Sequence, residues 1–215
     1  MWFKESLSEL SNYTKFPYVH NISKTLENVP HYASNIAQRM IDRKNEDSQI
    51  VLKDADNYYI AHNTLNDMIY MNMKNVLMID IDLQDINILE KFKECDEIFE
   101  VYKTRSGYHA FCVSKTFDHK DIDSYAEMVY SLNSDYFYIV FCYVKGWCVR
   151  LNLKDNEKGA SIYEYVGRFG GVSQKHAIEE CADIVNLHIE MSKLYIKDKS
   201  MKPRIIIDEY HKYDD

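Results

Sequence analysis

The pattern of hydrophobic and polar residues divides the chain into a helical start and a strand-rich middle. Residues 1–45 are patterned mainly as helix. Within them the stretch "HYASNIAQRMIDRK" places apolar residues at helical spacing: Ala33, Ile36, Ala37, Met40 and Ile41. Residues 49–63 hold two apolar runs separated by the turn-prone residues 54–57, which predicts two strands. Residues 68–83 predict a further strand or two.

The middle of the chain continues with a helix, a strand pair and a second helix. Residues 85–96 have apolar positions at i, i+3 and i+6, which predicts a short helix with Asp85 as its N-cap. Residues 97–114 predict two strands joined by a turn at the Ser-Gly step 106–107. Residues 119–133 gather apolar side chains on one face and predict another helix.

The last third of the chain carries one strongly β-like stretch and one long helix. Residues 136–153 are rich in aromatic and β-branched residues and break at Lys145-Gly146, which favours a β-hairpin. Residues 173–196 predict a closing helix, and residues 204–207 form a short strand candidate in a polar tail.

These elements together predict an α+β fold, with a mainly antiparallel sheet and helices packed on one face. The length and the absence of a Pro- or Gly-rich linker favour a single domain over residues 1–195. Residues 196–215 are then a C-terminal tail.

Composition and charge narrow the function only slightly. The chain has 215 residues, of which 46% are hydrophobic, and no apolar run is long enough to span a membrane. The start "MWFKESLSEL" lacks an apolar signal core, so we expect an intracellular protein that is not secreted and has no membrane partner. Five scattered cysteines without a Cys-x-x-Cys pair predict reduced thiols and no zinc site. A net charge of −8 disfavours a general nucleic-acid coat protein, although residues 140–176 carry six Lys or Arg against three Asp or Glu, a local balance of +3.

Two aspartates stand out in the strand "VLMIDIDLQD". Side chains at i and i+2 of a strand share a face, so Asp80 and Asp82 are expected about 7 Å apart at Cβ. Two like charges at that distance repel by roughly 2 kcal/mol at an effective dielectric of about 20. On a purely structural interpretation, both aspartates lie at a strand end that is exposed to water. On a functional interpretation, they bind one Mg²⁺ or Mn²⁺ ion together, because such ions take oxygen ligands and remove the repulsion.

A second candidate stretch is the strand-turn-strand "YKTRSGYHAFCVS". Gly107 would allow close approach of the backbone to a ligand, and His109 just after the turn could bond a phosphate oxygen. Arg105 lies beside them and can also pair with phosphate. A lone histidine in this position is more often a packing or surface residue, but the neighbouring cations Lys103 and Arg105 favour a phosphate site.

A third candidate stretch is "NSDYFYIVFCYVKGWCVRLNLK". Asp135 is expected to open a strand after a helix, and Arg150 lies within an apolar run, where a charged residue needs a partner or a function. Lys154 follows just beyond that run.

In this order the three stretches resemble the archaeo-eukaryotic primase superfamily, which includes the primase-polymerases, in its compact viral or mobile-element form. The superfamily has a hydrophobic-Asp-hydrophobic-Asp/Glu strand, here "MIDID", with Asp80 and Asp82. A small-x-His element follows, here "SGYH", with Gly107 and His109. The resemblance covers about residues 50–170, and each motif alone is weak.

The resemblance implies what the remaining residues do. Asp135 is the best match to the third acidic residue, so Asp80, Asp82 and Asp135 would be the catalytic metal ligands. Nucleotide binding would fall to six residues: Arg105, Ser106, Gly107, His109, Arg150 and Lys154. The implied fold is an RRM-like sheet with a small N-terminal α/β unit. We expect the strand 76–83 to be central in its sheet, with its aspartates facing a cleft shared with His109.

The implied activity is a metal-dependent nucleotidyltransferase that uses nucleoside triphosphates on a single-stranded DNA template during DNA replication. No Gly-x-x-x-x-Gly-Lys-Ser/Thr loop occurs, so a separate helicase or other replication protein would supply unwinding. The main alternative is a catalytically inactive relative that binds nucleic acid or protein in replication or in a virion. A metal-dependent nuclease ranks last, because Glu100 and Lys103 are one residue too far apart for the usual Glu-x-Lys pattern.

Overall fold

A computed structural model describes most of the chain from residue 49 to residue 197. The described ranges are 49–63, 68–121, 124–135, 138–139, 142, 146–152 and 163–197. The helices predicted for residues 1–45, the strand candidate 204–207 and Lys154 lie outside them.

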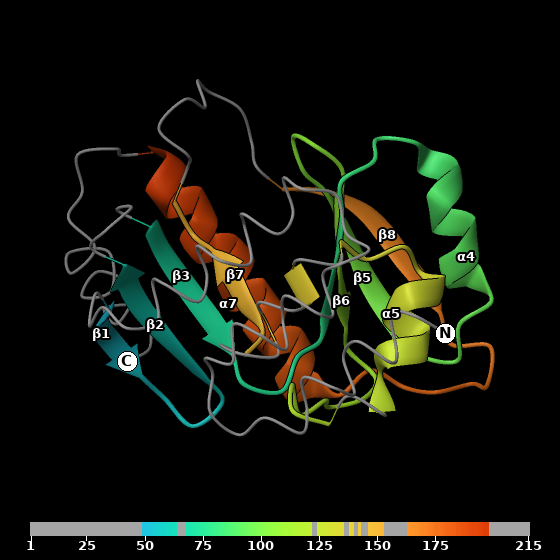
Figure 1. Ribbon diagram of the computed structural model, residues 1–215, viewed down its shortest axis with the longest axis horizontal. Helices are drawn as coiled ribbons and strands as arrows, with labels where there is room; N and C mark the ends of the chain where they lie inside the picture. Colours follow the sequence, from blue (N-terminus) through green and yellow to red (C-terminus); the bar gives the residue numbers. More distant parts are fainter. Residues whose placement is uncertain are drawn as a thin grey trace, which may run out of the picture.

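Two antiparallel four-stranded sheets form the framework, which confirms the α+β class with antiparallel pairing (Figure 1). The first sheet has the order β1-β2-β3-β7. Its strands are β1 (Gln49–Asp54), β2 (Tyr58–Asn63), β3 (Met68–Met73) and β7 (Cys148–Arg150). The two strands predicted for residues 49–63 are β1 and β2, and the Ala55 amide donates to the Tyr58 carbonyl oxygen to close their turn (2.9 Å).

The second sheet has the order β4-β6-β5-β8. Its strands are β4 (Met78–Ile81), β5 (Ile98–Lys103), β6 (Tyr108–Cys112) and β8 (Glu164–Gly170). β4 and β5 both flank β6 and run antiparallel to it. The expectation that the acid-bearing strand is central is therefore wrong, because β4 forms an edge of this sheet in the described part of the chain. The main chain at Asp135 covers that edge, since its amide donates to the Asp80 carbonyl oxygen (2.6 Å).

The helices flank the second sheet. The predicted helix after Asp85 is a 3-10 turn, η1 (Ile86–Leu89), followed by α4 (Glu90–Lys93), and the Asp85 carboxylate accepts from the Asn87 amide as an N-cap (3.0 Å). α5 (Ala126–Ser131) lies beside α4, where Lys91 Nζ donates to the Ser131 carbonyl oxygen (3.2 Å). The long helix α7 (Glu179–Lys197) agrees with the predicted closing helix.

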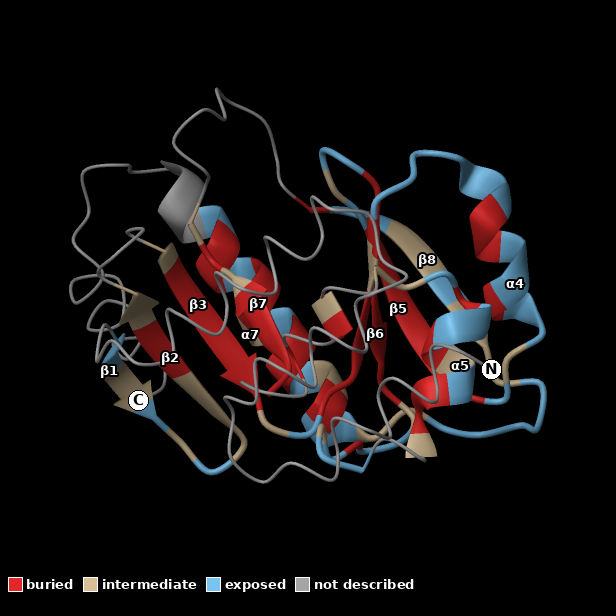
Figure 2. Cartoon of the chain, viewed as in Figure 1, coloured by how far each residue is buried: buried red, intermediate tan, exposed pale blue. Residues whose placement is uncertain are grey.

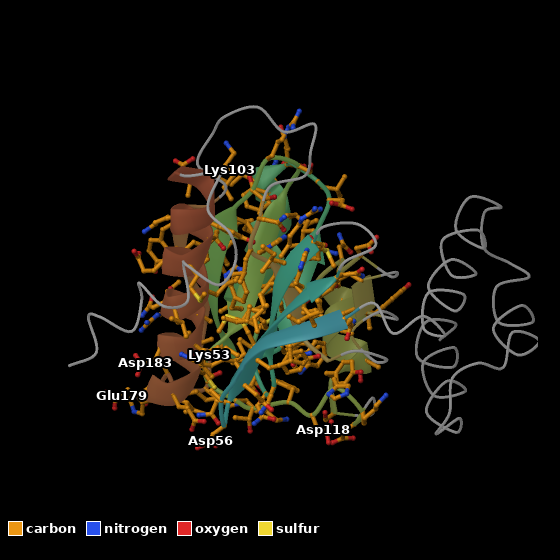
Figure 3. All side chains as sticks on the ribbon, turned by 90° about the vertical axis from the view of Figure 1, so that its left-hand side faces the viewer. Lys53, Asp56, Lys103, Asp118, Glu179 and Asp183 are labelled. Atoms are coloured by element: carbon orange, nitrogen blue, oxygen red, sulfur yellow. The ribbon has the colours of Figure 1, made fainter. Side chains whose placement is uncertain are left out.

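Helices cover both faces of the second sheet, not one face as predicted. Phe92 of α4 packs edge-on against Phe99 of β5, with ring centroids 5.1 Å apart. His188 of α7 packs against Phe111 of β6 at 5.6 Å. Phe111 pairs in register with Glu100, so Phe111 and Phe99 point to opposite faces. Figure 3 shows the same arrangement, with α7 on one side of the strands and α5 on the other.

The predicted β-hairpin at residues 136–153 is also wrong. Tyr138, Ile139 and Cys142 are helical, and among the described residues of this segment β7 is the extended part. The Asp135 carboxylate accepts from the Tyr138 amide (2.6 Å), and the Ile139 amide donates to the Asp135 carbonyl oxygen (3.3 Å). Ile139 and Cys142 are fully buried. Burial explains the apolar residues at these two positions, and a continuous apolar run does not by itself distinguish a buried helix from a strand.

One continuous hydrophobic core joins the two sheets. It includes Ile60 and Met71 from the first sheet and Ile79 and Phe99 from the second, all with no exposed surface. Figure 2 shows the buried residues concentrated on the inner strands β3, β5 and β6. All five cysteines are free thiols. No helix in the described ranges is long and apolar enough to cross a membrane.

Candidate functional site

Asp80 and His109 lie side by side on neighbouring strands. They are register partners in the β4–β6 ladder, and partners in an antiparallel pair point to the same face. Asp80 Oδ1 lies 3.3 Å from His109 Nε2. The Asp80 side chain is 25% exposed and the His109 side chain 19%, so solvent reaches both from half-buried positions. The expected meeting of the two motifs on one face is confirmed.

Asp82 and the turn between β5 and β6 border this pair. Asp82 lies just beyond the end of β4 and is exposed. Arg105 and Ser106, in the turn, are exposed as well. Gln84 connects the two segments, because its side-chain amide donates to the Arg105 carbonyl oxygen (2.6 Å). The residues predicted to bind phosphate on the turn are therefore held close to the acid-bearing strand.

Gly107 has a structural role that the sequence did not reveal. A Cβ atom here would overlap the carbonyl oxygen of Ile81 and would lie 2.9 Å from the Leu83 amide nitrogen. The Gly107 amide donates to Thr104 Oγ1 (3.1 Å), which closes the turn. The close approach expected at Gly107 is thus made to the backbone of the acid-bearing strand, and Gly107 is buried.

Asp135 lies next to Asp80 through its main chain. Its amide bonds the Asp80 carbonyl oxygen at 2.6 Å. Its carboxylate Oδ1 accepts from the Tyr138 amide, also at 2.6 Å, and so caps the buried helical segment. The expectation that Asp135 opens a strand is wrong. Its position beside the acidic strand agrees with the predicted third acid, but one carboxylate oxygen is already engaged as a helix cap.

Arg150 lies on the other sheet, at the end of β7. Its guanidinium Nε donates to Asn152 Oδ1 (3.4 Å), and the side chain is half-buried. Its carbonyl oxygen lies 3.4 Å from His188 Nε2, and this contact connects the main chain at Arg150 to α7. Lys154 lies outside the described residues.

Tyr163, which sequence reasoning missed, completes a chain of contacts with Asp80 and His109. Its hydroxyl lies 3.2 Å from His109 Nδ1, on the opposite side of the ring from Asp80. Only 8% of Tyr163 is exposed. The signal that could have found it is the aromatic run "IYEYVGRF", whose register against β5 and β6 is a long-range property of the fold.

The interior wall of the site is uncharged. Burial raises the pKa of the Tyr138 hydroxyl well above its usual value, and the neighbouring Cys142 thiol makes a smaller contribution in the same direction. Burial also raises the pKa of the Cys142 thiol. Burial lowers the pKa of His188 to about 3, with a smaller contribution from the nearby His109. These groups stay neutral at physiological pH, so Asp80 and His109 carry the local polarity.

The carboxylates fit a divalent cation in chemistry and access. Mg²⁺ is commonly held by one or two carboxylates completed by substrate phosphates and water. Asp80 and Asp82, two positions apart at a strand end, offer such oxygens to solvent. Within the described residues, no group of three or more His, Cys, Asp or Glu side chains is arranged to hold a metal ion. The donor set fits a two-carboxylate site that phosphate completes, and Asp135 stays a predicted ligand.

A separate groove of about 770 Å³ lies between the β1–β2 turn and the first turns of α7. Its charged lining is mainly acidic, with Lys53 against Asp56, Glu179, Glu180 and Asp183. Figure 3 shows Asp56 and Glu179 at one end of the molecule and Lys103, which ends β5, at the other. The groove therefore lies apart from the candidate site, and its charge disfavours phosphate.

No known protein family, curated protein or solved structure matched the chain in comparisons with each.

Proposed function

We propose that the protein is a metal-dependent nucleotidyltransferase of the primase or primase-polymerase type, which acts on a single-stranded DNA template in replication. The observation that carries the proposal is the contact between Asp80 and His109 (3.3 Å). The two residues come from separate sequence motifs, and register pairing brings both to one half-buried face. A carboxylate and a phosphate-binding imidazole belong together in a site that handles a cation and a triphosphate.

The strand order supports the RRM-like part of the proposal. β4, α4, β5, β6 and α5 follow one another in the chain, and β6 lies between β4 and β5. This is a split β-α-β arrangement. α4 and α5 lie side by side, which leaves the Asp80 face to other groups. The first sheet would supply strands of the small second unit, whose predicted N-terminal helices lie outside the described residues.

The proposed role of each residue combines the family resemblance with the geometry of the site. When bound, Mg²⁺ or Mn²⁺ would lower the pKa of the attacking 3′-hydroxyl and neutralise charge on the triphosphate. Asp80 and Asp82 would hold the cation, with Asp135 beside them. His109 would donate its Nε2–H to a phosphate oxygen. The exposed turn residues Arg105 and Ser106 would bind phosphate, together with Arg150 and Lys154, and Gly107 would hold their turn against the acid-bearing strand.

The alternative is an inactive primase-like protein that binds nucleic acid or protein in replication or in a virion. Two observations favour it. The Asp135 carboxylate is engaged as a helix cap, and Asp80 pairs with His109 instead of standing open to a cation. Both arrangements would have to change partners, at least partly, in a working active site.

Extension of a labelled primer on a single-stranded template tests the proposal. Wild-type protein is supplied with Mn²⁺ and with ribonucleotides or deoxynucleotides separately. Template-dependent extension that disappears in the Asp80→Asn, Asp82→Asn double variant supports the enzyme. Metal-dependent triphosphate binding without extension supports the inactive relative, and neither binding nor extension contradicts both the metal site and the family assignment.

A further inference from the structure

We propose that Tyr163 is a positioning residue for His109: its hydroxyl fixes the imidazole so that the Nε2–H faces Asp80 and the phosphate site. This inference rests on the proposed function and deepens it. It adds a residue that none of the sequence motifs contains.

Both ring nitrogens of His109 have partners on opposite sides. Nε2 lies 3.3 Å from Asp80 Oδ1, and Nδ1 lies 3.2 Å from the Tyr163 hydroxyl. An ionised carboxylate only accepts hydrogen bonds, so the proton of a neutral His109 belongs on Nε2. Nδ1 is then an acceptor, and the Tyr163 hydroxyl, which can donate or accept, donates to it.

Packing holds the Tyr163 ring where its hydroxyl can do this. The His109 and Tyr163 ring centroids are 5.4 Å apart. Tyr163 also packs edge-on against the fully buried His188 of α7 (5.1 Å) and against Tyr102 of β5 (6.3 Å). Through its contact with Tyr163, α7 therefore supports the His109 ring on the face of the sheet that carries Asp80.

The single Nε2–H has two candidate acceptors, the Asp80 carboxylate and a phosphate oxygen of the substrate. Without Tyr163, a neutral ring could place its proton on Nδ1 or rotate, and would then present a lone pair to phosphate. With Tyr163 in place, the ring keeps its orientation when the Nε2–H passes from Asp80 to phosphate. Tyr163 thus acts through His109 and does not itself touch the substrate.

Tyr163→Phe in the full chain removes the hydroxyl and keeps the ring. Tyr102→Phe is the matched control, because it removes a hydroxyl from a buried tyrosine on the same face, whose ring contacts Tyr163. Two measurements are made on each protein. Calorimetric titration with a nucleoside triphosphate and Mn²⁺ gives the affinity, and long-range ¹H–¹⁵N NMR in mildly alkaline buffer without metal locates the His109 ring proton.

We expect Tyr163→Phe to weaken triphosphate binding about fivefold, the equivalent of one hydrogen bond, and Tyr102→Phe to leave it unchanged. We expect the wild-type spectrum to show the proton on Nε2, and the Nδ1 resonance to move toward the value of a free acceptor in Tyr163→Phe alone. The wild-type spectrum needs no variant, so a proton on Nδ1 there would overturn the assignment even if Tyr163→Phe failed to fold.

The outcomes separate this inference from the proposed function. If the wild type binds triphosphate and both tyrosine variants bind equally well, Tyr163 has no positioning role and the proposed function stands. If the wild type does not bind triphosphate with Mn²⁺, the proposed function fails and the role given to Tyr163 fails with it.

Discussion

Gly107 and Ile81 meet backbone to backbone, where the turn after β5 crosses the end of the acid-bearing strand. A Cβ atom on Gly107 would overlap the Ile81 carbonyl oxygen. The two motifs of the candidate site are therefore joined by close packing as well as by the Asp80–His109 contact. The glycine is needed because the neighbouring backbone leaves no room for a side chain.

Gly107→Ala should therefore destabilise the fold and shift the turn. Overpacking of this kind costs about 1–3 kcal/mol, and here the obstructing atoms are backbone, which yields less easily than a side chain. Urea unfolding measures the change. Ser106→Ala is the control, because an exposed neighbour should change stability by less than about 0.5 kcal/mol. Equal stability of Gly107→Ala and wild type would show that the two segments are less tightly packed than described.

Local signals in the sequence were sufficient for the strand pairs. Residues 49–63 and 97–114 carry alternating runs with turn residues between them, and both form antiparallel pairs. Asp85 was recognised as a helix cap because capping depends only on the residues that follow it. Asp80 and His109 were expected in one site because their two motifs resemble those of the primase superfamily, and the strand register brings them together.

Tertiary context decided the elements that sequence reasoning missed. Ile139 and Cys142 are fully buried in a helical segment, and an apolar run without regular polar positions resembles a strand in sequence. β8 contains Gly167, whose φ of +153° and register shift mark a β-bulge, and such glycines look like loop in a sequence. Tyr163 reaches His109 only through the register of the folded sheet.

His188 should make the protein less stable in acid. Burial lowers its pKa to about 3 from an ordinary value of 6.5. Between these values the unfolded chain binds a proton that the folded chain resists, so stability is complete above 6.5 and falls as the pH drops toward 3. From about pH 7.5 to about pH 5 the expected loss is about 2 kcal/mol.

His188→Gln should remove that loss, because glutamine keeps hydrogen-bonding groups without titrating. Urea unfolding at both pH values measures the difference between variant and wild type, so other titrating groups largely cancel. His176→Gln is the control, since His176 is exposed. A pH dependence in His188→Gln equal to that of the wild type would show that His188 accepts a proton in the folded protein.

The Asp80→Asn, Asp82→Asn double variant should fold normally and lose metal-dependent triphosphate binding. Asp80 is half-buried and pairs with a histidine, and asparagine keeps an oxygen that can accept from the ring, so the expected loss is about 1 kcal/mol. The amides keep the shape but bind a divalent cation poorly. Thermal shift with Mn²⁺ and a nucleoside triphosphate measures both properties. Asp56→Asn, in the turn between β1 and β2 and at the opposite end of the molecule from Lys103 in Figure 3, should keep the full shift.

Arg150→Lys should weaken triphosphate binding roughly tenfold or more if the guanidinium donates hydrogen bonds to two phosphate oxygens. Lysine keeps the charge but lacks the planar fork, and a charge-assisted hydrogen bond is worth about 1.5–3 kcal/mol. A bare nucleoside should bind equally well to both forms. Arg168→Lys is the control, because Arg168 already pairs with Glu100 through its Nε (2.7 Å). Equal triphosphate affinity for Arg150→Lys and wild type would remove Arg150 from the site.

Two substitutions at Asp135 separate its capping role from its predicted metal role. Its carboxylate caps the buried helical segment through the Tyr138 amide, so Asp135→Ala should lower the free energy of unfolding by about 1 kcal/mol. Asparagine is an equally good cap, so Asp135→Asn should keep nearly all of that stability. It replaces a charged oxygen pair with one neutral oxygen, so metal-dependent triphosphate binding should weaken in Asp135→Asn if the residue is the third ligand. Urea unfolding and calorimetric titration with Mn²⁺ give the two quantities. Wild-type affinity in Asp135→Asn would leave the residue a helix cap that places its backbone amide against Asp80, and the cation site would then consist of Asp80 and Asp82.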